Sequence, residues 1–291
     1  MEFGSLTPLE GGWSGETFVA DLAQGERAVV RIHARRPERA EVDAALMRLV
    51  RGLLPVPDVL EVRRGDAAAD LPALLVTQFL PGVRGDLLLP TLDDAGLAVV
   101  GRQMGDLAAR LAGMPTLVPG AFVGPDLRIE TWDLPDGLPG FVEATHLDQW
   151  ESFELDALAS VAEAAQDILD AVRRTSVVHS DLNPKNVLID PDTRVITALL
   201  DWEFAHSGSP FTDLGNVLRF ERHPAYVAAA LAAFEEREGT APSEALALAR
   251  AADLWALVDL AGRRAANPVA ERAHGLLREV VRDSTQHSRR A

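Results

Sequence analysis

Short apolar runs, which turn residues separate, follow one another along the first eighty residues. Residues 17–20 alternate, the runs 28–32 and 73–79 are further apolar segments of strand length, and a turn of sequence Gln-Gly-Glu at 24–26 separates 17–20 from 28–32. Alternation with a period of two places every second side chain on one face, as in a half-buried β-strand. We therefore predict a small antiparallel sheet in this part of the chain.

Most of the remaining chain carries apolar residues at spacings of three and four, which is the period of an α-helix. One such helix, 38–50, interrupts the predicted strands and begins just after a proline. The other predicted helices cover 93–111, 155–174, 226–238, 243–262 and 267–283. Residues 114–140 are rich in Pro and Gly with scattered aromatic residues, and we interpret them as a surface excursion.

A break follows the last predicted strand, where Pro81 and Gly82 come directly after Leu80. Proline and glycine stop a strand abruptly, and such a stop suits a linker between two structural units. The pattern therefore predicts an α+β fold of two lobes. We expect a β-rich lobe over 1–80 and a larger, mainly helical lobe over 81–291.

The most informative stretch is a polar loop between two apolar runs. Val177 and Val178 precede the loop, and the apolar run 187–189 follows it. Between them the chain has the spacing His-x-Asp-x-x-x-x-Asn, formed by residues 179–186. A folding chain gains nothing by placing these polar side chains between two apolar strands, so we infer that they serve chemistry. The spacing is that of the catalytic loop of kinases.

In such a loop each polar residue has a chemical task. Asp181 is predicted to accept or orient the proton of a substrate hydroxyl group. Asn186, together with Asp201 at the end of the next apolar run, is predicted to bind Mg²⁺ through oxygen atoms. His179 is predicted to be structural, with its ring hydrogen-bonded to the backbone, because Mg²⁺ prefers oxygen ligands. Asp213 is expected to brace the loop.

Two neighbours of these residues carry charge. Glu203 lies two residues beyond Asp201 on the same side of an extended segment, and we expect it to approach the metal site. Lys185, the only lysine of the chain, lies beside Asn186. The sequence leaves open whether its ammonium group reaches a phosphate or points into solvent.

The predicted β lobe has features that suit a nucleotide. The glycine-rich turn that contains Gly12 and Ser14 has backbone N–H groups that suit phosphate oxygens. Arg31 occupies the strand position at which kinases carry a phosphate-binding lysine, and its alternative interpretation is an exposed arginine on an edge strand. The acid that pairs with Arg31 is expected on the following helix, where we favour Glu41 over Glu38.

The segment that joins the two lobes is expected to contact the base of the nucleotide. Backbone groups from Gln78 to Leu80, with Phe79 between them, are placed where they reach the adenine edge. The nucleotide would then lie between the two lobes.

The composition narrows the function further. The chain has 291 residues, of which 47% are hydrophobic and 25% charged, as in an ordinary folded protein. It has no cysteine, which excludes disulfides, thiolate zinc sites and a cysteine nucleophile. The net charge of −16 repels nucleic acids and anionic membranes and attracts cations. No apolar run approaches the ~18 to 20 residues of a membrane span, so we expect a cytoplasmic protein.

The acceptor of the phosphoryl group is expected to be a small molecule. Only eleven residues separate Asp201 from Asp213, and no Ala-Pro-Glu motif follows. This leaves no room for an activation segment or for a platform that binds a protein substrate. The candidate residues for contacts with the acceptor in the helical lobe are Glu154, Asp253, Trp255 and Asp259.

The chain resembles the bacterial aminoglycoside phosphotransferases, antibiotic kinases with a protein-kinase-like fold of two lobes. The segments that carry this resemblance are 55–57, 79–82, 179–186, 201–203 and 210–215. The resemblance implies ATP or GTP as the phosphoryl donor, Mg²⁺, and a hydroxyl group on a cationic antibiotic as the acceptor. That antibiotic would be an aminoglycoside or a cyclic peptide of the viomycin and capreomycin type, and the negative charge of the chain fits it.

The sequence departs from this family at Arg31, where lysine is usual, and at Ser180, where glycine is frequent. Two other functions therefore stay open. A metabolic kinase of the same fold, acting on choline, homoserine or a sugar, would share the catalytic loop. A nucleotide-binding pseudokinase is favoured only by Arg31, and the intact Asp181, Asn186 and Asp201 argue against it.

Overall fold

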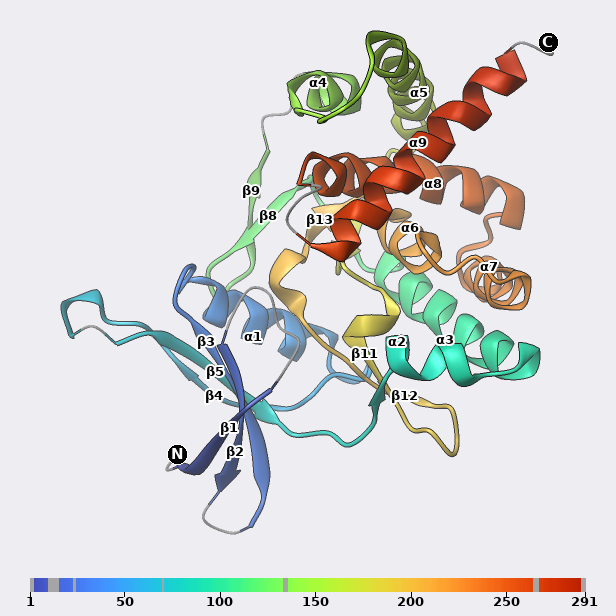
Figure 1. Cartoon of the computed structure of the whole chain (residues 1–291). Helices are drawn as coiled ribbons and strands as arrows, with labels where there is room; N and C mark the ends of the chain where they lie inside the picture. The colour runs from blue at the N-terminus through green and yellow to red at the C-terminus, as the bar shows by residue number, and fades with distance from the viewer. Residues whose placement is uncertain are drawn as a thin grey trace.

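The computed structural model has two lobes, a sheet lobe from the first part of the chain and a larger lobe of helices with short strands (Figure 1). This is the α+β, kinase-like arrangement that the sequence predicts. The structure describes residues 3–9, 16–22, 25–69, 71–132, 136–263 and 267–288.

The first lobe is a five-stranded antiparallel sheet with one helix packed on it. The strand order is β1-β2-β3-β5-β4. Its elements are β1 (Phe3–Pro8), β2 (Glu16–Leu22), β3 (Arg27–His33), α1 (Arg39–Val50), β4 (Val59–Arg63), the 3₁₀ helix η1 (Ala67–Ala69) and β5 (Ala73–Gln78). The strands and the helix predicted for this region are confirmed.

The second lobe consists mainly of helices, and the helices predicted from apolar periodicity are all present. The larger helices are α3 (Asp94–Ala112), α5 (Ser152–Asp170), α7 (Pro224–Glu238), α8 (Pro242–Gly262) and α9 (Pro268–Ser288). The smaller ones are α2 (Gly85–Leu88), η2 (Leu89–Thr91), α4 (Gly137–Ala144), η3 (Pro184–Asn186), η4 (Trp202–Phe204) and α6 (Thr212–Leu218). Its strands are β6 (Val83–Arg84), β7 (Pro115–Thr116), β8 (Gly120–Val123), β9 (Arg128–Thr131), β10 (Thr175–Val178), β11 (Val187–Ile189), β12 (Ile196–Leu199) and β13 (His206–Gly208).

The described residues of 114–140 lie mainly at the surface, as expected of a surface excursion, but they include strands that the sequence analysis did not predict. Strands β7, β8 and β9 join β10 and β13 in a five-stranded sheet of order β7-β10-β13-β8-β9. The ring of Phe122 on β8 is buried, and Gly120 lies so close to β9 that a Cβ there would be 2.2 Å from the carbonyl oxygen of Glu130. Here glycine permits close strand contact, whereas its abundance in the sequence indicated a loop.

The segment after the linker lies next to the catalytic strands. Strand β6 pairs with β11, so that Arg84 lies opposite Leu188, and β11 pairs in turn with β12. Because β5 ends at Gln78 and β6 already belongs to the second lobe, we retain the boundary between lobes at residue 80 as a proposal.

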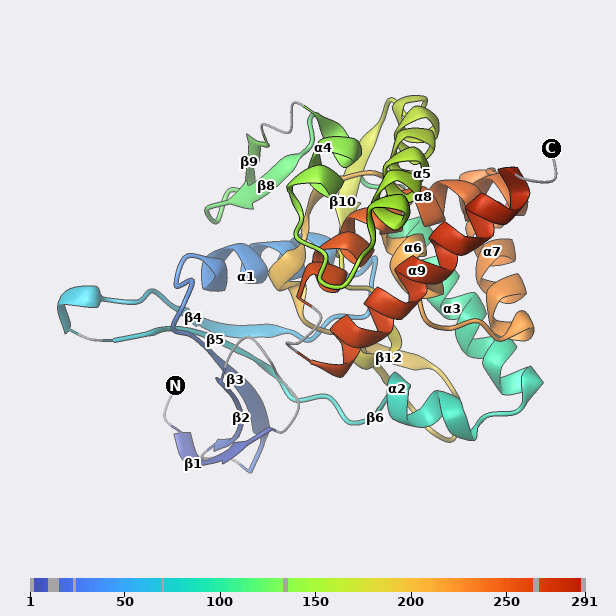
Figure 2. The same cartoon turned by 45° about the horizontal axis from the view of Figure 1, so that its top comes forward.

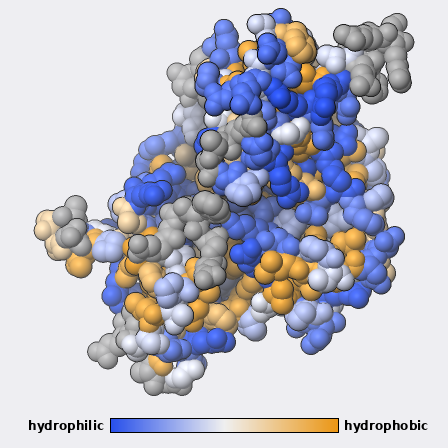
Figure 3. All heavy atoms as spheres, viewed as in Figure 1, coloured by the Kyte–Doolittle hydropathy of each residue, from blue (hydrophilic) through white to orange (hydrophobic). Residues whose placement is uncertain are grey.

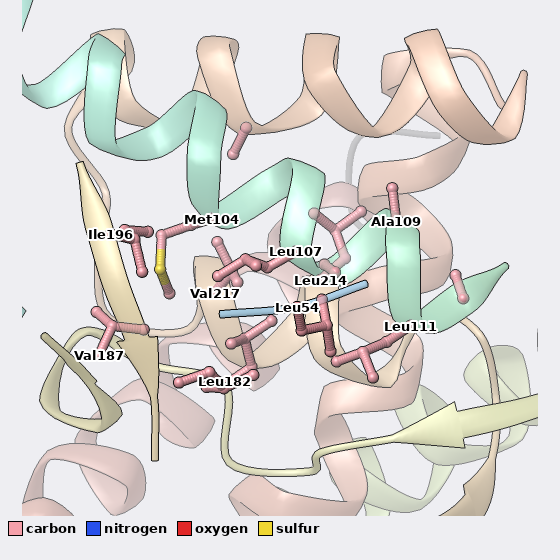
Figure 4. Close-up of a cluster of buried hydrophobic side chains, with 14 of the residues drawn as sticks. Leu54, Met104, Leu107, Ala109, Leu111, Leu182, Val187, Ile196, Leu214 and Val217 are labelled. Carbon is pink, nitrogen blue, oxygen red and sulfur yellow. The ribbon is translucent and has the colours of Figure 1, made fainter. Parts of the chain in front are cut away.

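The main hydrophobic core anchors the catalytic loop (Figure 4). Leu182, inside the loop, is fully buried, and it lies among apolar side chains of α3, α6 and the β11–β12 hairpin. Those labelled in Figure 4 include Met104, Leu107, Leu111, Val187, Ile196, Leu214 and Val217. A loop with one side chain in a close-packed core has little freedom to shift.

Helices α3 and α7 lie side by side in both views and pack closely, because α3 presents glycines to α7 (Figures 1 and 2). A Cβ atom at Gly105 would lie 2.1 Å from the carbonyl oxygen of Ala230, and one at Gly101 would lie 2.4 Å from that of Tyr226. Real Cβ contacts are never this short, so these helices approach at a distance that only glycine allows.

The substitution Gly105→Ala is therefore expected to destabilise the fold by about 1–3 kcal/mol, the usual cost of overpacking. Gly275→Ala on α9 is the matched control, because no atom lies within 4 Å of the new Cβ. It is expected to stabilise the fold by up to about 1 kcal/mol through helix propensity. Urea unfolding measures both changes, and a stabilised Gly105→Ala variant would contradict the packing of α3 on α7.

Within the described residues, no helix combines the length and the apolar character needed to cross a membrane.

Candidate active site

The carboxylate of Asp181 is held by two side-chain amides from the same loop. Asn183 Nδ2 donates to Asp181 Oδ1 at 2.7 Å, and Asn186 Nδ2 donates to Asp181 Oδ2 at 2.6 Å. The same two amide groups also donate to the backbone oxygen of Asp181, at 3.1 and 2.9 Å. Both carboxylate oxygens are thereby oriented: two hydrogen bonds fix the rotamer of Asp181, and the other two tie the same amides to its backbone.

The environment of Asp181 also makes it a stronger base. Burial raises the pKa of Asp181 to about 6, although the hydrogen bond from Asn186 and the positive charge of Arg219 oppose the rise. A carboxylate with a pKa near neutrality is still ionised at pH 7 and accepts a proton more readily than an exposed aspartate. The loop thus supplies an oriented acceptor for a proton.

His179 has a structural position, as predicted. Its ring is fully buried, and Nε2 lies 2.9 Å from the carbonyl oxygen of Leu200. The backbone N–H of Asp181 donates to Nδ1 at 3.3 Å, and the ring contacts Trp202 edge to face. Burial lowers the pKa of His179 to about 4, so the ring is neutral, with the proton on Nε2. The histidine therefore joins the catalytic loop to the end of β12.

Asp213 braces the loop from α6, as the sequence analysis expects. Its carboxylate accepts hydrogen bonds from the backbone N–H groups of His179 and Ser180, each at 2.8 Å. Ser180 has a φ of 66°, which is left-handed backbone, and this explains why glycine is frequent at the position in the family that the chain resembles. Burial raises the pKa of Asp213 to about 7, and the two N–H donors oppose that rise.

Asp201 faces the β lobe and contacts Arg31. Arg31 Nη1 lies 2.6 Å from Asp201 Oδ1, and Arg31 Nη2 lies 2.9 Å from Glu203 Oε2. Burial opposes the charge of Arg31, yet the two carboxylates outweigh it, so the pKa of Arg31 is raised. Arg31 on β3 therefore lies in the site and is not an exposed arginine on an edge strand.

The predicted pair of Arg31 with Glu41 is replaced by another arrangement. Glu41 is on the outer side of α1 and forms an ion pair with Arg64 at 2.7 Å. The acid on the inner side of α1 is Asp43, which forms a buried ion pair with Arg39 at 2.7 Å. Two residues along a helix change the face by about 200°, so an acid near the right place in the sequence lies on the wrong side.

A cavity of about 430 Å³ lies between the lobes beside these residues. Gln78, Phe79 and Leu80 line it where the chain crosses from one lobe to the other, and Asn186 and Asp201 line it on the catalytic side. Apolar side chains of both lobes and three cations complete the lining, among them Val29, Leu75, Leu188, Leu200, Arg31, Arg84 and Lys185. Gly12 and Ser14, which we predicted to contact phosphates, lie outside the described residues.

The four residues proposed to contact an acceptor have structural partners instead. Asp253 is buried and binds Arg219, with Nη2 to Oδ1 at 2.6 Å, so its carboxylate does not face an acceptor. Glu154 takes part in the capping box of α5 and pairs with Arg278. The ring of Trp255 packs against Phe141, and Asp259 pairs with Arg263. The predicted acceptor role of these residues gains no support, and for Asp253 it is wrong.

The ion pair of Asp253 and Arg219 is connected to the catalytic loop through Asn216, a contact that the sequence analysis did not predict. Asn216, one turn earlier on α6, donates to Asp253 at 3.3 Å and accepts the backbone N–H of Leu182 at 3.3 Å. Arg219 in turn lowers the pKa of Asp181 by its charge. This cluster therefore supports the catalytic loop from the side of α6 and α8.

Comparison with known proteins identifies the family of the chain. Residues 5–254 match the model of the phosphotransferase enzyme family. The chain belongs to this family. This match confirms the predicted family and the predicted class of enzyme, a small-molecule phosphotransferase.

Solved structures of phosphotransferases share the fold. One is a ternary complex of a thermostable mutant of aminoglycoside phosphotransferase APH(4)-Ia with ADP and hygromycin B, with a TM-score of 0.68 and 19% identity over 96% of this chain and 94% of that one. Another is the apoenzyme of macrolide 2′-phosphotransferase MphH from Brachybacterium faecium, with a TM-score of 0.58 and 22% identity over 94% and 91% of the chains. Identities this low establish the shared fold.

A curated relative is the acyl-CoA dehydrogenase family member 10 of Mus musculus, which is 25% identical over 169 residues. The match covers 55% of this phosphotransferase chain but only 15% of the length of that protein. It therefore concerns one part of a much longer protein.

Proposed function

We propose that this phosphotransferase transfers the γ-phosphoryl group of ATP to a hydroxyl group of a small cationic antibiotic. An aminoglycoside is the first acceptor class, and a tuberactinomycin-type cyclic peptide is the second. The observation that carries the proposal is the fixed carboxylate of Asp181 beside a cavity that Arg31, Asn186 and Asp201 line.

The cavity between the lobes supports a nucleotide as the phosphoryl donor. Its apolar lining, with Val29 from β3 and Leu188 from β11, suits a flat base, and the backbone from Gln78 to Leu80 suits the polar edge of that base. The cations of the lining suit the phosphates, because charge-assisted contacts to phosphate are strong. ADP occupies the related aminoglycoside phosphotransferase complex, and GTP is the competing donor to test.

The residues on the catalytic side fit Mg²⁺. Asn186 directs Nδ2 toward Asp181, so its oxygen is the atom that would meet a cation, and Asp201 contributes a carboxylate. Mg²⁺ commonly binds one or two protein oxygen ligands together with substrate phosphates, so this small donor set is sufficient. When bound, the ion neutralises charge that develops on the phosphates.

The transfer requires little covalent chemistry from the chain. The acceptor oxygen attacks the γ-phosphorus and forms the new P–O bond, while the bond from that phosphorus to the bridging oxygen breaks and ADP leaves with the electron pair. Asp181 accepts the proton of the acceptor hydroxyl group. The rotamer of Asp181, fixed by Asn183 and Asn186, places a carboxylate oxygen for this step.

Two features support a small cationic acceptor: the negative net charge of the chain and the short, folded segment after Asp201. The chain has 44 acidic and 28 basic residues, and Figure 3 shows hydrophilic residues over much of the helical lobe. The residues between Asp201 and Asp213 are folded into η4 and into β13, which lies in the middle of its sheet. This short, paired segment offers no platform for a protein substrate, and the negative charge disfavours nucleic acid.

An acceptor panel tests the proposal. Release of ADP or GDP is measured with aminoglycosides, tuberactinomycin peptides and macrolides, and also with choline, homoserine and sugars. We expect an aminoglycoside or a cyclic peptide to stimulate turnover most. Stimulation by choline, homoserine or a sugar alone would identify a metabolic kinase. Nucleotide binding without stimulation by any acceptor would identify a pseudokinase.

A further inference from the structure

We propose that Glu203 positions Arg31 for the nucleotide phosphates, in the role that an acid on the following helix has in protein kinases. Glu203 would be a positioning residue that acts through Arg31. The inference rests on the proposed function, because it concerns the same nucleotide cavity.

The contacts of Arg31 carry the first step. One terminal nitrogen of its guanidinium lies 2.6 Å from Asp201 and the other lies 2.9 Å from Glu203. The side chains of Arg31 and Glu203 are only 16% and 19% exposed, so solvent screens this ion pair little. Because the guanidinium is planar, two contacts at its two ends fix the direction in which the group faces.

The acids of α1 are engaged elsewhere, which is the second step. Asp43 forms its ion pair with Arg39, and both side chains are almost fully buried. Asp43 acts on Arg31 more weakly than Asp201 and Glu203 do. Glu41 pairs with Arg64 on the outer face of the helix. The acid that holds Arg31 therefore comes from the catalytic turn and not from α1.

Helix α1 has its own connection to that turn. Arg39 Nη2 donates to the backbone oxygen of Trp202 at 2.8 Å. Trp202 stands in the sequence between Asp201 and Glu203, the two residues whose carboxylates hold Arg31. The helix thus packs against the turn through Arg39, and it leaves the side chain of Glu203 to Arg31. In place of one ion pair between a strand cation and a helix acid, this chain has two: Arg31 of β3 pairs with Glu203, and Arg39 of α1 pairs with Asp43.

The local backbone explains why Glu203 reaches Arg31. Asp201 has a φ of 67° and a ψ of 69°, which is left-handed backbone, and η4 begins directly after it. This turn brings the carboxylates of residues 201 and 203 to the same guanidinium. An arginine contacts two carboxylates as a fork, whereas a lysine ammonium is a compact point charge. Arginine at position 31 and glutamate at position 203 therefore fit each other.

The two carboxylates differ in what they can contribute to nucleotide binding. Asp201 lines the cavity and is the proposed ligand for Mg²⁺, whereas Glu203 is outside the cavity lining. A carboxylate oxygen that binds a metal ion no longer has all its lone pairs for an arginine, so Asp201 would hold Arg31 less firmly when Mg²⁺ is bound. Glu203 can keep Arg31 in place throughout, which makes it the permanent partner of the guanidinium.

The test is a double-mutant cycle on nucleotide affinity, measured by calorimetry with ADP, Mg²⁺ and the full chain. Glu203→Gln is expected to weaken ADP binding by about 10-fold or more, since hydrogen bonds to charged groups have effects of this size. Adenosine, which lacks phosphates, is expected to bind both proteins equally. In an Arg31→Gln background, Glu203→Gln is expected to have no further effect on ADP affinity.

Glu61→Gln is the matched control. Glu61 lies on β4 of the same lobe and pairs with Arg63 at the surface, so its loss is expected to leave ADP affinity unchanged. Glu203→Asp keeps the charge but shortens the side chain. It is expected to show an intermediate loss of ADP affinity with full adenosine binding. If Glu203→Gln also loses adenosine binding, Glu203→Asp replaces it as the test variant.

The outcomes separate this inference from the proposed function. Equal ADP affinity in wild type and Glu203→Gln would overturn it, and so would an equal effect of Glu203→Gln with and without Arg31. A wild-type chain that binds neither adenosine nor ADP would overturn the proposed function itself. An effect on ADP that vanishes in the Arg31→Gln background would establish Glu203 as the positioning residue.

Discussion

Replacement of Asp181 by asparagine is expected to lower kcat for phosphoryl transfer by more than about 10²-fold, the usual effect of a positioned general base. Asparagine has nearly the same shape but does not accept the proton, and one of its two polar atoms becomes a donor. Nucleotide affinity is expected to change little, because Asp181 is not among the residues that line the cavity. Steady-state turnover and calorimetry with ADP measure the two quantities.

Asp192→Asn is the matched control for this experiment. Asp192 is exposed in the turn between β11 and β12, away from the hydrogen bonds that fix Asp181. Its turnover is expected to equal that of the wild type. Unchanged turnover in Asp181→Asn would contradict the role of Asp181, because the hydroxyl proton would then have another acceptor.

The substitution Asp201→Asn is expected to raise the Mg²⁺ concentration needed for half-maximal turnover by at least about 10²-fold. Mutation of groups that merely support metal ligands costs 10–100-fold in affinity or activity, and loss of a ligand charge costs no less. Arg31 also loses its contact at 2.6 Å, so Glu203 becomes its main carboxylate partner. A titration of turnover with Mg²⁺ measures the change.

Thermal unfolding provides the control for Asp201→Asn. Asp201 is part-exposed, and its exchange for the amide is expected to leave the fold intact, as measured by the unfolding temperature. If the mutant showed the wild-type dependence on Mg²⁺, Asp201 would be an anchor for Arg31 only. The metal ligands would then have to be sought elsewhere in the cavity.

Local sequence patterns were sufficient to predict most of the fold. The strands β2, β3 and β5 coincide with short apolar runs between turn residues, and the long helices follow the helical period. The short strands β7, β8 and β9 were missed, because a strand of two to four residues shows no measurable period and its glycines indicate a loop. Only the pairing with β10 and β13, which lie far along the chain, makes these residues strands.

The candidate site divides in the same way. The spacing from His179 to Asn186 placed the loop residues because their contacts are local, as the bonds from Asn183 and Asn186 to Asp181 show. Contacts between distant segments were not visible. The pair of Arg31 and Glu203 joins residues 172 positions apart.

Buried charges were the other source of error. Asp253 was a candidate for contact with an acceptor, whereas in the structure it is buried. Its carboxylate pairs with Arg219, which is 34 positions away, directly after α6. On α1, the acids at 41 and 43 look equivalent in the sequence, and the presence of Arg39 one turn before Asp43 decides which of them is buried.

The most direct test of the proposed function is the transfer of the phosphoryl group itself. Wild type and Asp181→Asn are incubated with ATP, Mg²⁺ and an aminoglycoside such as hygromycin B or a tuberactinomycin peptide, and phosphorus NMR and mass spectrometry follow the acceptor. We expect the wild type to form a phosphate monoester on an acceptor hydroxyl group and the mutant to form almost none. ATP binding by the wild type without a phosphorylated acceptor from any tested class would contradict the proposal.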